Sequence, residues 1–244
     1  MKDEFCLGQL KIYDKSYFEG SRDLSTSRIE KTVALLGDID GKRILDVGCG
    51  TGECSVLMRR LGAKVVCADI AKYATLACHK NGFESILCVA HMLPFKENSF
   101  DGVLLADVIE HIPEKVAAKS LSDIKRITKD SGRIGIHSMP NFFLERLSIV
   151  YGLINKRHWR RPGTEGGHIN TYTPWRLEKE IRLAGLEVLY FNISTYPENA
   201  PFSSVVSPIS RHLKKFLGND LWVCCTVPRI KGCMSENQFQ SRAP

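Results

Sequence analysis

The sequence ILDVGCGTG occupies residues 44–52, and it determines how the rest of the chain is expected to fold. Its apolar residues Ile44, Leu45 and Val47 are typical of a short buried strand, and a glycine then follows at every second position. Glycine allows a sharp turn with positive φ and lets a ligand lie directly against the main chain. A helix is expected to begin near Gly52. Strand, glycine turn and helix together predict a nucleotide-sized crevice in a doubly wound α/β fold.

The charges around this turn favour a cationic ligand over a dinucleotide. A dinucleotide motif needs a glycine where this chain has Glu53, and a carboxylate there would face the pyrophosphate. Asp46 adds a second negative charge just before the turn. S-adenosylmethionine has no phosphate and carries a sulfonium and an ammonium group, so acidic surroundings suit it. The stretch resembles the first motif of class I S-adenosylmethionine-dependent methyltransferases, Asp/Glu-x-Gly-x-Gly-x-Gly. The resemblance implies cofactor contacts from Asp46, Gly48, Cys49 and Gly50.

Composition limits the chain to one well-filled α/β domain in a soluble protein. It has 244 residues, of which 43% are hydrophobic, and it contains no apolar run of eighteen or more residues. The acidic start does not resemble a signal peptide. Nine cysteines are scattered singly, apart from Cys224-Cys225, and no Cys-x-x-Cys pair occurs. This usage predicts a reducing cytoplasm rather than a disulfide framework or a zinc site.

The second strand is expected over residues 63–70, with Asp69 at its end. Asp69 lies 21 residues after Gly48, the separation at which such a unit delivers an acid to the ribose hydroxyls. A carboxylate can accept hydrogen bonds from both hydroxyls at once. We therefore expect Asp69 to bind the ribose of the cofactor, while a solvated aspartate at a strand end is the alternative.

The third strand, residues 85–90, leads into HMLPFKENSFD at 91–101. This segment resembles the methyltransferase stretch Asp-Ala-x-x-Leu-Pro-Phe-x-x-x-x-Phe-Asp. The aspartate that usually contacts the adenine amine is Val89 here. The resemblance then implies that adenine relies on the backbone of Ala90, on His91 and on packing against Met92 and Ile70.

Further strands are expected at 101–106, 132–138, 186–193 and 221–227, with helices at 113–127 and 174–184 between them. Strands alternating with helices predict a Rossmann-like doubly wound seven-stranded sheet. We expect it to be mostly parallel, with an antiparallel last strand and helices on both faces. Residues 1–40 are expected to form an arm and helix packing on the core. The methyltransferase domain is expected over 41–228, with a capping insertion at about 141–173 and a disordered tail at 229–244.

Aromatic residues Tyr13, Tyr17 and Phe18 precede the first motif. Related methyltransferases often carry a similar stretch, which folds over the cofactor as a lid. An amphipathic arm packed on the domain is the alternative interpretation.

Methyl transfer to a hydroxyl needs a base, and histidine titrates near neutrality. Three candidates follow strand ends or lie in the capping segment: His111, His137 and His168. Glu110-His111, with Gly-x-x-x-Gly-His and Tyr-Thr-Pro downstream, resembles the ubiquinone-biosynthesis O-methyltransferases. That resemblance implies catalytic roles for His111, Glu110 and His168, with Ala106 bordering the reaction site. It also allows Mg²⁺ on Asp107, Glu110 and His111, although the same pair is widespread in methyltransferases without a metal, so a metal site is not favoured.

The partner is expected to be a small or lipid-like hydroxyl acceptor. The net charge of +7 permits anionic partners without identifying one. Basic, partly aromatic segments within 141–161 and 208–217 could contact an anionic membrane surface, could bind tRNA, or could be solvated loops. We therefore expect a cytoplasmic O-methyltransferase, with peripheral membrane contact left open. An RNA methyltransferase and a cofactor-binding regulator without turnover are the alternatives, and the sequence does not indicate an oligomeric state.

Overall fold

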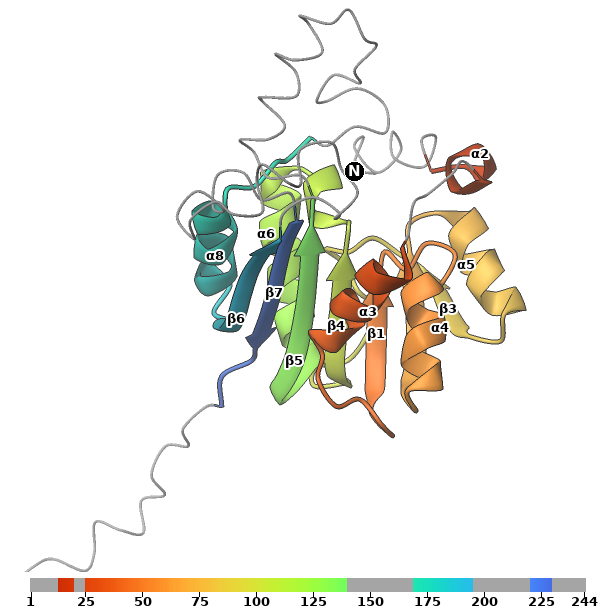
Figure 1. Cartoon of the computed structure of the whole chain (residues 1–244), viewed down its shortest axis with the longest axis horizontal. Coiled ribbons are helices and arrows are strands. Elements are labelled where there is room, and N and C mark those ends of the chain that lie inside the picture. The colour runs from red at the N-terminus through yellow and green to blue at the C-terminus, as the bar shows by residue number, and fades with distance from the viewer. Residues whose placement is uncertain (1–12, 20–24, 140–168, 195–219, 230–244) are drawn as a thin grey trace, which may run out of the picture.

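The computed structural model describes residues 13–19, 25–139, 169–194 and 220–229 of the chain (Figure 1). In these ranges a seven-stranded sheet has the order β3-β2-β1-β4-β5-β7-β6. The pairs among β1 to β5 are parallel, whereas β7 is antiparallel to both β5 and β6. The strands are β1 (Arg43–Val47), β2 (Lys64–Asp69), β3 (Glu84–Leu87), β4 (Phe100–Ala106), β5 (Thr128–Ser138), β6 (Glu187–Ser194) and β7 (Asp220–Thr226). The predicted doubly wound sheet with one antiparallel strand is therefore confirmed.

Helices cover both faces of this sheet, as Figure 1 shows with α3 and α4 in front and α6 behind. The helices are α2 (Lys15–Glu19), α3 (Thr26–Ala34), α4 (Glu53–Arg60), α5 (Lys72–Lys80), α6 (Glu114–Ile127) and α8 (Pro174–Leu183), with a 3₁₀ turn η1 (Ile109–His111). Local chemistry sets their starts. Ser25 and Thr173 accept hydrogen bonds from the backbone N–H groups of Arg28 and Arg176, and Pro113 precedes α6.

Alternate residues of the central strands face two separate apolar cores. Leu45 and Leu105 pack on the side of α6 and α8, whereas Ile44 and Leu104 pack against α3 and α4. This two-sided burial explains why β1 and β4 are nearly continuous apolar runs. It also fixes the register in which the carboxyl ends of β1, β2 and β4 form one edge.

Two strand predictions differ from the structure. β3 ends at Leu87, because the chain then turns away from the sheet and Met92 donates a hydrogen bond to the carbonyl of Val89. β5 begins earlier than expected, at Thr128, and its register against β4 shifts beside Gly132. Ser131 has a φ of 60° there, which is typical of a bulged strand. Neither difference moves the carboxyl ends of β1, β2 and β4, which border the cavity.

Within the described part of the chain, the structure contains no helix of sufficient length and apolarity to span a membrane.

Candidate active site

A cavity opens at the carboxyl ends of β1, β2 and β4. It comprises about 790 Å³ of space when its open mouth is included. Backbone of the glycine turn forms its floor, and side chains from β2, η1 and α2 form its walls. This is the edge at which open α/β sheets bind their ligands.

The floor requires glycine at position 48. Gly48 has a φ of +70°, and a Cβ built on it would lie 2.1 Å from Cγ2 of Val108. Gly50 also lies in the left-handed region, with a φ of 55°. The N–H of Gly48 donates to the carbonyl of Ala68 at 2.7 Å, which holds the turn against β2. The turn therefore brings bare backbone to the cavity, as the sequence predicted.

Asp69 lies at the end of β2 and lines the cavity. The side chain is 8% exposed, and its two oxygens accept hydrogen bonds from the N–H groups of Gly50 at 2.9 Å and Ala71 at 2.8 Å. These bonds fix the orientation of the carboxylate.

Asp46 and Cys49 do not line the cavity. The Asp46 carboxylate accepts a hydrogen bond from the Ser55 hydroxyl at 2.6 Å, and burial raises its pKa to about 8. Cys49 packs against Cys67, Cys78 and other apolar groups. Direct cofactor contact by these two side chains stays a prediction without support from the geometry.

The wall expected to hold adenine is only partly as predicted. Ile70, Ala90 and His91 line the cavity, and Val89 lines it too. Met92 is 69% exposed and lies outside the lining, because the turn after β3 directs it to solvent. Ala106 lies outside it as well and packs on the α3 side of the sheet.

Aromatic side chains of α2 and the residues before it cover the cavity. Tyr13, Tyr17 and Phe18 all line it, which is the arrangement that the lid interpretation predicts. Tyr13 and Tyr17 pack edge to face with ring centroids 4.8 Å apart, and Phe18 stacks on Tyr73 of α5 at 5.7 Å. In Figure 1, α2 lies at the upper edge of the sheet near α5.

A cluster of charged side chains lies beside the cavity, at the carboxyl ends of β4 and β5. Asp107 follows β4 with a left-handed φ of 55° and is paired with Arg28 of α3. His137 of β5 is fully buried, with Nδ1 at 2.8 Å from Asp107 and Nε2 at 3.5 Å from Asp220, although neither contact has the angles of a hydrogen bond. Sequence patterns did not reveal Arg28 or Asp220, because Arg28 reaches Asp107 from α3 and Asp220 reaches His137 through the pairing of β5 with β7.

The electrostatics of this cluster exclude His137 as a base. Burial alone would lower the pKa of His137, but its contacts with Asp107 and Asp220 raise it to about 9. Burial would likewise raise the pKa of Asp107, but His137 and Arg28 hold it well below its usual range. His137 is thus a buried cation at neutral pH, with no proton-accepting nitrogen at the cavity.

Glu110 is also buried and lies outside the cavity lining. Its carboxylate accepts from the Ser138 hydroxyl at 3.1 Å and the Met139 N–H at 3.3 Å, and burial raises its pKa to about 8. Its backbone carbonyl accepts from the N–H groups of Ile169 and Asn170. These contacts tie η1 to β5 and to residues 169–170, which is a structural role. A direct catalytic role for Glu110 stays a prediction without geometric support.

The three residues on which the resemblance allows Mg²⁺ do not form a cation site in this structure. Asp107 faces Arg28 and His137, and Glu110 faces Ser138. Asp107, Glu110 and His111 do not bring their ligand atoms within 4.8 Å of one another. This set does not fit Mg²⁺.

His111 is the histidine candidate that lines the cavity next to Asp107. It lies in η1, and its ring meets Tyr13 edge to face at 6.3 Å. Apolar side chains of Val108, Ile112 and Val116 line the same wall. The third candidate, His168, lies outside the described residues, as do the basic segments within 141–161 and 208–217.

Fold and cavity together define a nucleoside-binding domain of the doubly wound kind. A family model described as a methyltransferase domain matches residues 45–136. The ubiquinone biosynthesis O-methyltransferase of Bordetella avium is 31% identical over 195 residues, which cover 76% of this chain and 79% of that protein. The protein of the same name from Xanthomonas oryzae pv. oryzae (strain PXO99A) is 32% identical over 123 residues, 48% of this chain and 50% of its own. The chain thus spans about half the length of that relative.

A solved structure of an S-adenosylmethionine-dependent methyltransferase from Methanosarcina mazei has the same fold. Its TM-score is 0.59 at 17% identity, over 80% of this chain and 95% of that one. The chain belongs to the S-adenosylmethionine-dependent methyltransferases.

Proposed function

We propose that the chain transfers the methyl group of S-adenosylmethionine to a hydroxyl oxygen of a small or lipid-like acceptor. The observation that carries this proposal is a histidine on an apolar cavity wall, His111 beside Val108, Ile112 and Val116. A hydroxyl acceptor must lose a proton as the new bond forms, and histidine can take it up at neutral pH. The names of the curated relatives are consistent with such an acceptor.

The cavity fits the cofactor on structural grounds. Gly48 and Gly50 bring backbone without side chains to the cavity, and backbone N–H groups orient Asp69 so that it could accept from the ribose hydroxyls. Apolar and aromatic side chains, including Ile70 and Phe18, would enclose the rest and exclude water. When bound, the cofactor supplies an electrophilic methyl group on its sulfonium.

An acid lies beside His111 in the cavity lining. Burial would raise the pKa of this acid, Asp107, but His137 and Arg28 hold it low, so it stays ionised across the neutral range. Transfer from a sulfonium is an in-line displacement, so most of the remaining work is positioning. We propose that the cavity walls position the acceptor for this displacement.

A lipid-like acceptor would also suit contact with a membrane surface. The segments predicted for it, within 141–161 and 208–217, lie outside the described residues, so this part of the proposal, like a cytoplasmic location, rests on sequence alone.

The test is transfer of labelled methyl groups to fractionated cell extract. Label is expected in the small-molecule or lipid fraction, and His111→Gln should lower kcat by about 100-fold or more while cofactor affinity stays within about threefold. Label in RNA would contradict the proposed acceptor. Cofactor binding without any labelled product would indicate a regulator, and an unchanged kcat in His111→Gln would refute the assigned base.

A further inference from the structure

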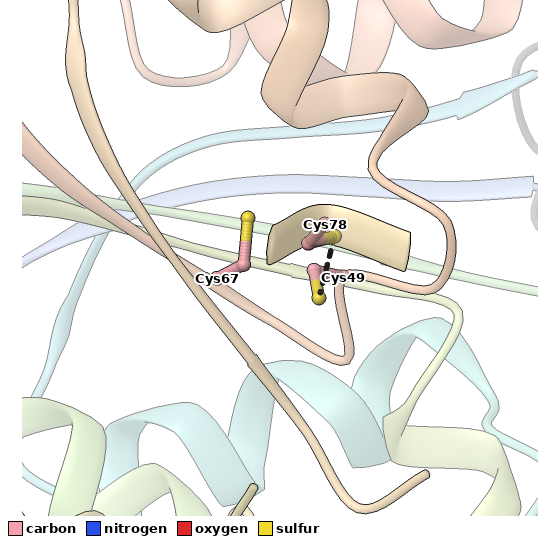
Figure 2. Close-up of side chains that lie close together, drawn as sticks. All are labelled: Cys49, Cys67 and Cys78. Atoms are coloured by element: carbon pink, nitrogen blue, oxygen red, sulfur yellow. Dashed lines mark hydrogen bonds between the residues drawn. The ribbon is translucent and has the colours of Figure 1, made fainter. Parts of the chain in front are cut away.

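Three cysteine side chains meet beneath the glycine turn, outside the lining of the cavity. Cys49 belongs to the turn, Cys67 to β2 and Cys78 to α5, and Figure 2 shows the three side chains lying close together. All three are buried and reduced, and their sulfur atoms lie within 4.8 Å of one another. Among the side chains that the structure describes, no other group of three His, Cys, Asp or Glu brings its ligand atoms so close. Scattered spacing in the sequence had predicted no such cluster.

The spacing is close to that of a thiolate metal site. Zinc binds sulfur at about 2.3 Å in a tetrahedron, which places neighbouring sulfurs about 3.8 Å apart. The sulfurs of Cys49 and Cys78 are 3.6 Å apart (Figure 2, dashed line). The sulfur of Cys67 lies within 4.8 Å of both, which completes a triangle of three sulfurs.

The surroundings of the sulfurs are polar as well as apolar. The carbonyl of Gly50 accepts weak hydrogen bonds from Cys49 at 3.6 Å and Cys78 at 3.5 Å, and the Ser55 hydroxyl lies 3.2 Å from the sulfur of Cys67. Thiolates are the form that binds metals. Packing of cysteines as small hydrophobic side chains would explain their burial but not this convergence of polar contacts.

We propose that Cys49, Cys67 and Cys78 bind one zinc ion, or a similarly thiophilic divalent ion, as thiolates. Ser55 offers the nearest oxygen for a fourth position. Each thiol proton leaves to solvent as its sulfur–metal bond forms, so binding weakens at low pH. The ion would join the turn, β2 and α5. Because Cys49 lies between the two glycines that line the cavity, a bound ion would hold the turn in its cofactor-binding shape.

The test uses the whole reduced chain, stripped of metal and titrated with Zn²⁺ and with Cd²⁺, whose thiolate complexes absorb in the ultraviolet. One ion per chain is expected to bind, to raise the melting temperature and, at a urea concentration that exposes the buried thiols of the metal-free chain, to protect three thiols from alkylation. Mass spectrometry of the alkylated peptides should identify them as Cys49, Cys67 and Cys78. Cys67→Ala and Cys78→Ala should each weaken binding by about 100-fold or more, because even changes behind metal ligands cost about 10–100-fold.

Cys225→Ala is the matched control. This thiol is also buried, but it lies in β7 within the core that packs against α6 and α8. It should retain stoichiometric binding and the full charge-transfer absorption. Failure of the wild-type chain to bind one equivalent would overturn the proposal, and so would protection of a different set of thiols. Equal losses in Cys225→Ala and Cys67→Ala would overturn it too. Thiol protection in the wild-type chain decides the question even where a variant does not fold.

Discussion

Asp69 and Asp46 offer a direct comparison of two acids that the sequence assigned to the same ligand. Asp69 lines the cavity with its carboxylate fixed by two backbone N–H groups, whereas Asp46 is bonded to Ser55 outside the lining. We predict that Asp69→Asn strongly weakens S-adenosylmethionine binding and that Asp46→Asn does not.

The magnitude follows from the hydrogen bonds involved. A hydrogen bond to a charged acceptor contributes about 1.5–3 kcal/mol, and two ribose hydroxyls would bond to the Asp69 carboxylate. In Asp69→Asn, one of its oxygens becomes an NH₂ group. Either amide orientation then turns a donor toward the N–H of Gly50 or Ala71, so the side chain also loses its alignment. A loss of about 3 kcal/mol corresponds to a Kd raised by about 100-fold.

Asp46→Asn changes little because the native carboxyl is already neutral at pH 7. Its pKa is raised to about 8 by burial, and an amide oxygen can still accept from Ser55. We expect a Kd within about threefold of wild type. Isothermal titration calorimetry with the cofactor measures both variants, and circular dichroism checks that each is folded. Equal Kd values for the two variants, or the larger loss in Asp46→Asn, would refute this account of the cofactor site.

Two other predictions concern the turn and the buried charges. Gly48→Ala should abolish measurable cofactor binding, because the new Cβ would meet Val108. Gly41 has a similar φ of +68°, but a Cβ there would meet nothing within 4 Å. Gly41→Ala should therefore lower the free energy of unfolding only by the left-handed strain of about 1–2 kcal/mol, measured by thermal or denaturant unfolding. The stability contributed by protonated His137 is complete below pH 6.5 and is lost as pH rises through about 9, so the free energy of unfolding should fall by up to about 3 kcal/mol over that window. His137→Gln should reduce the slope of this fall in urea titrations, since buried carboxyls and thiols with raised pKa values contribute the remainder, and a slope unchanged in this variant would contradict the assignment.

Much of the cofactor site could be predicted from the sequence because it depends on local order. The glycine turn and Asp69 follow directly from strand–turn–helix patterns, and the structure brings Gly48, Gly50 and Asp69 to one cavity. Met92 was misplaced since the exact direction of the turn after β3 depends on where pairing with β2 ends.

Features that depend on strand order were not predictable in the same way. Arg28, Asp107, His137 and Asp220 come from four separate elements, and they meet because β5 lies between β4 and β7. No spacing along the chain signals this. The one available cue was a histidine within an apolar strand, which indicates a buried polar group that needs partners.

The contacts of Arg28 and His137 with Asp107 affect which histidine can serve as the base. A non-glycine residue at a φ of 55° carries local strain of about 1–3 kcal/mol, which is retained only where surrounding contacts compensate for it. Arg28 and His137 provide those contacts, and in doing so they keep Asp107 ionised. His137 is fully buried outside the cavity lining and its contacts with Asp107 and Asp220 raise its pKa to about 9, so of the two histidines close to Asp107 His111 is the one that faces the cavity. A pH profile of kcat with a single rising limb that His111→Gln removes would agree with this division of roles, and a limb that survives in His111→Gln would place the base elsewhere.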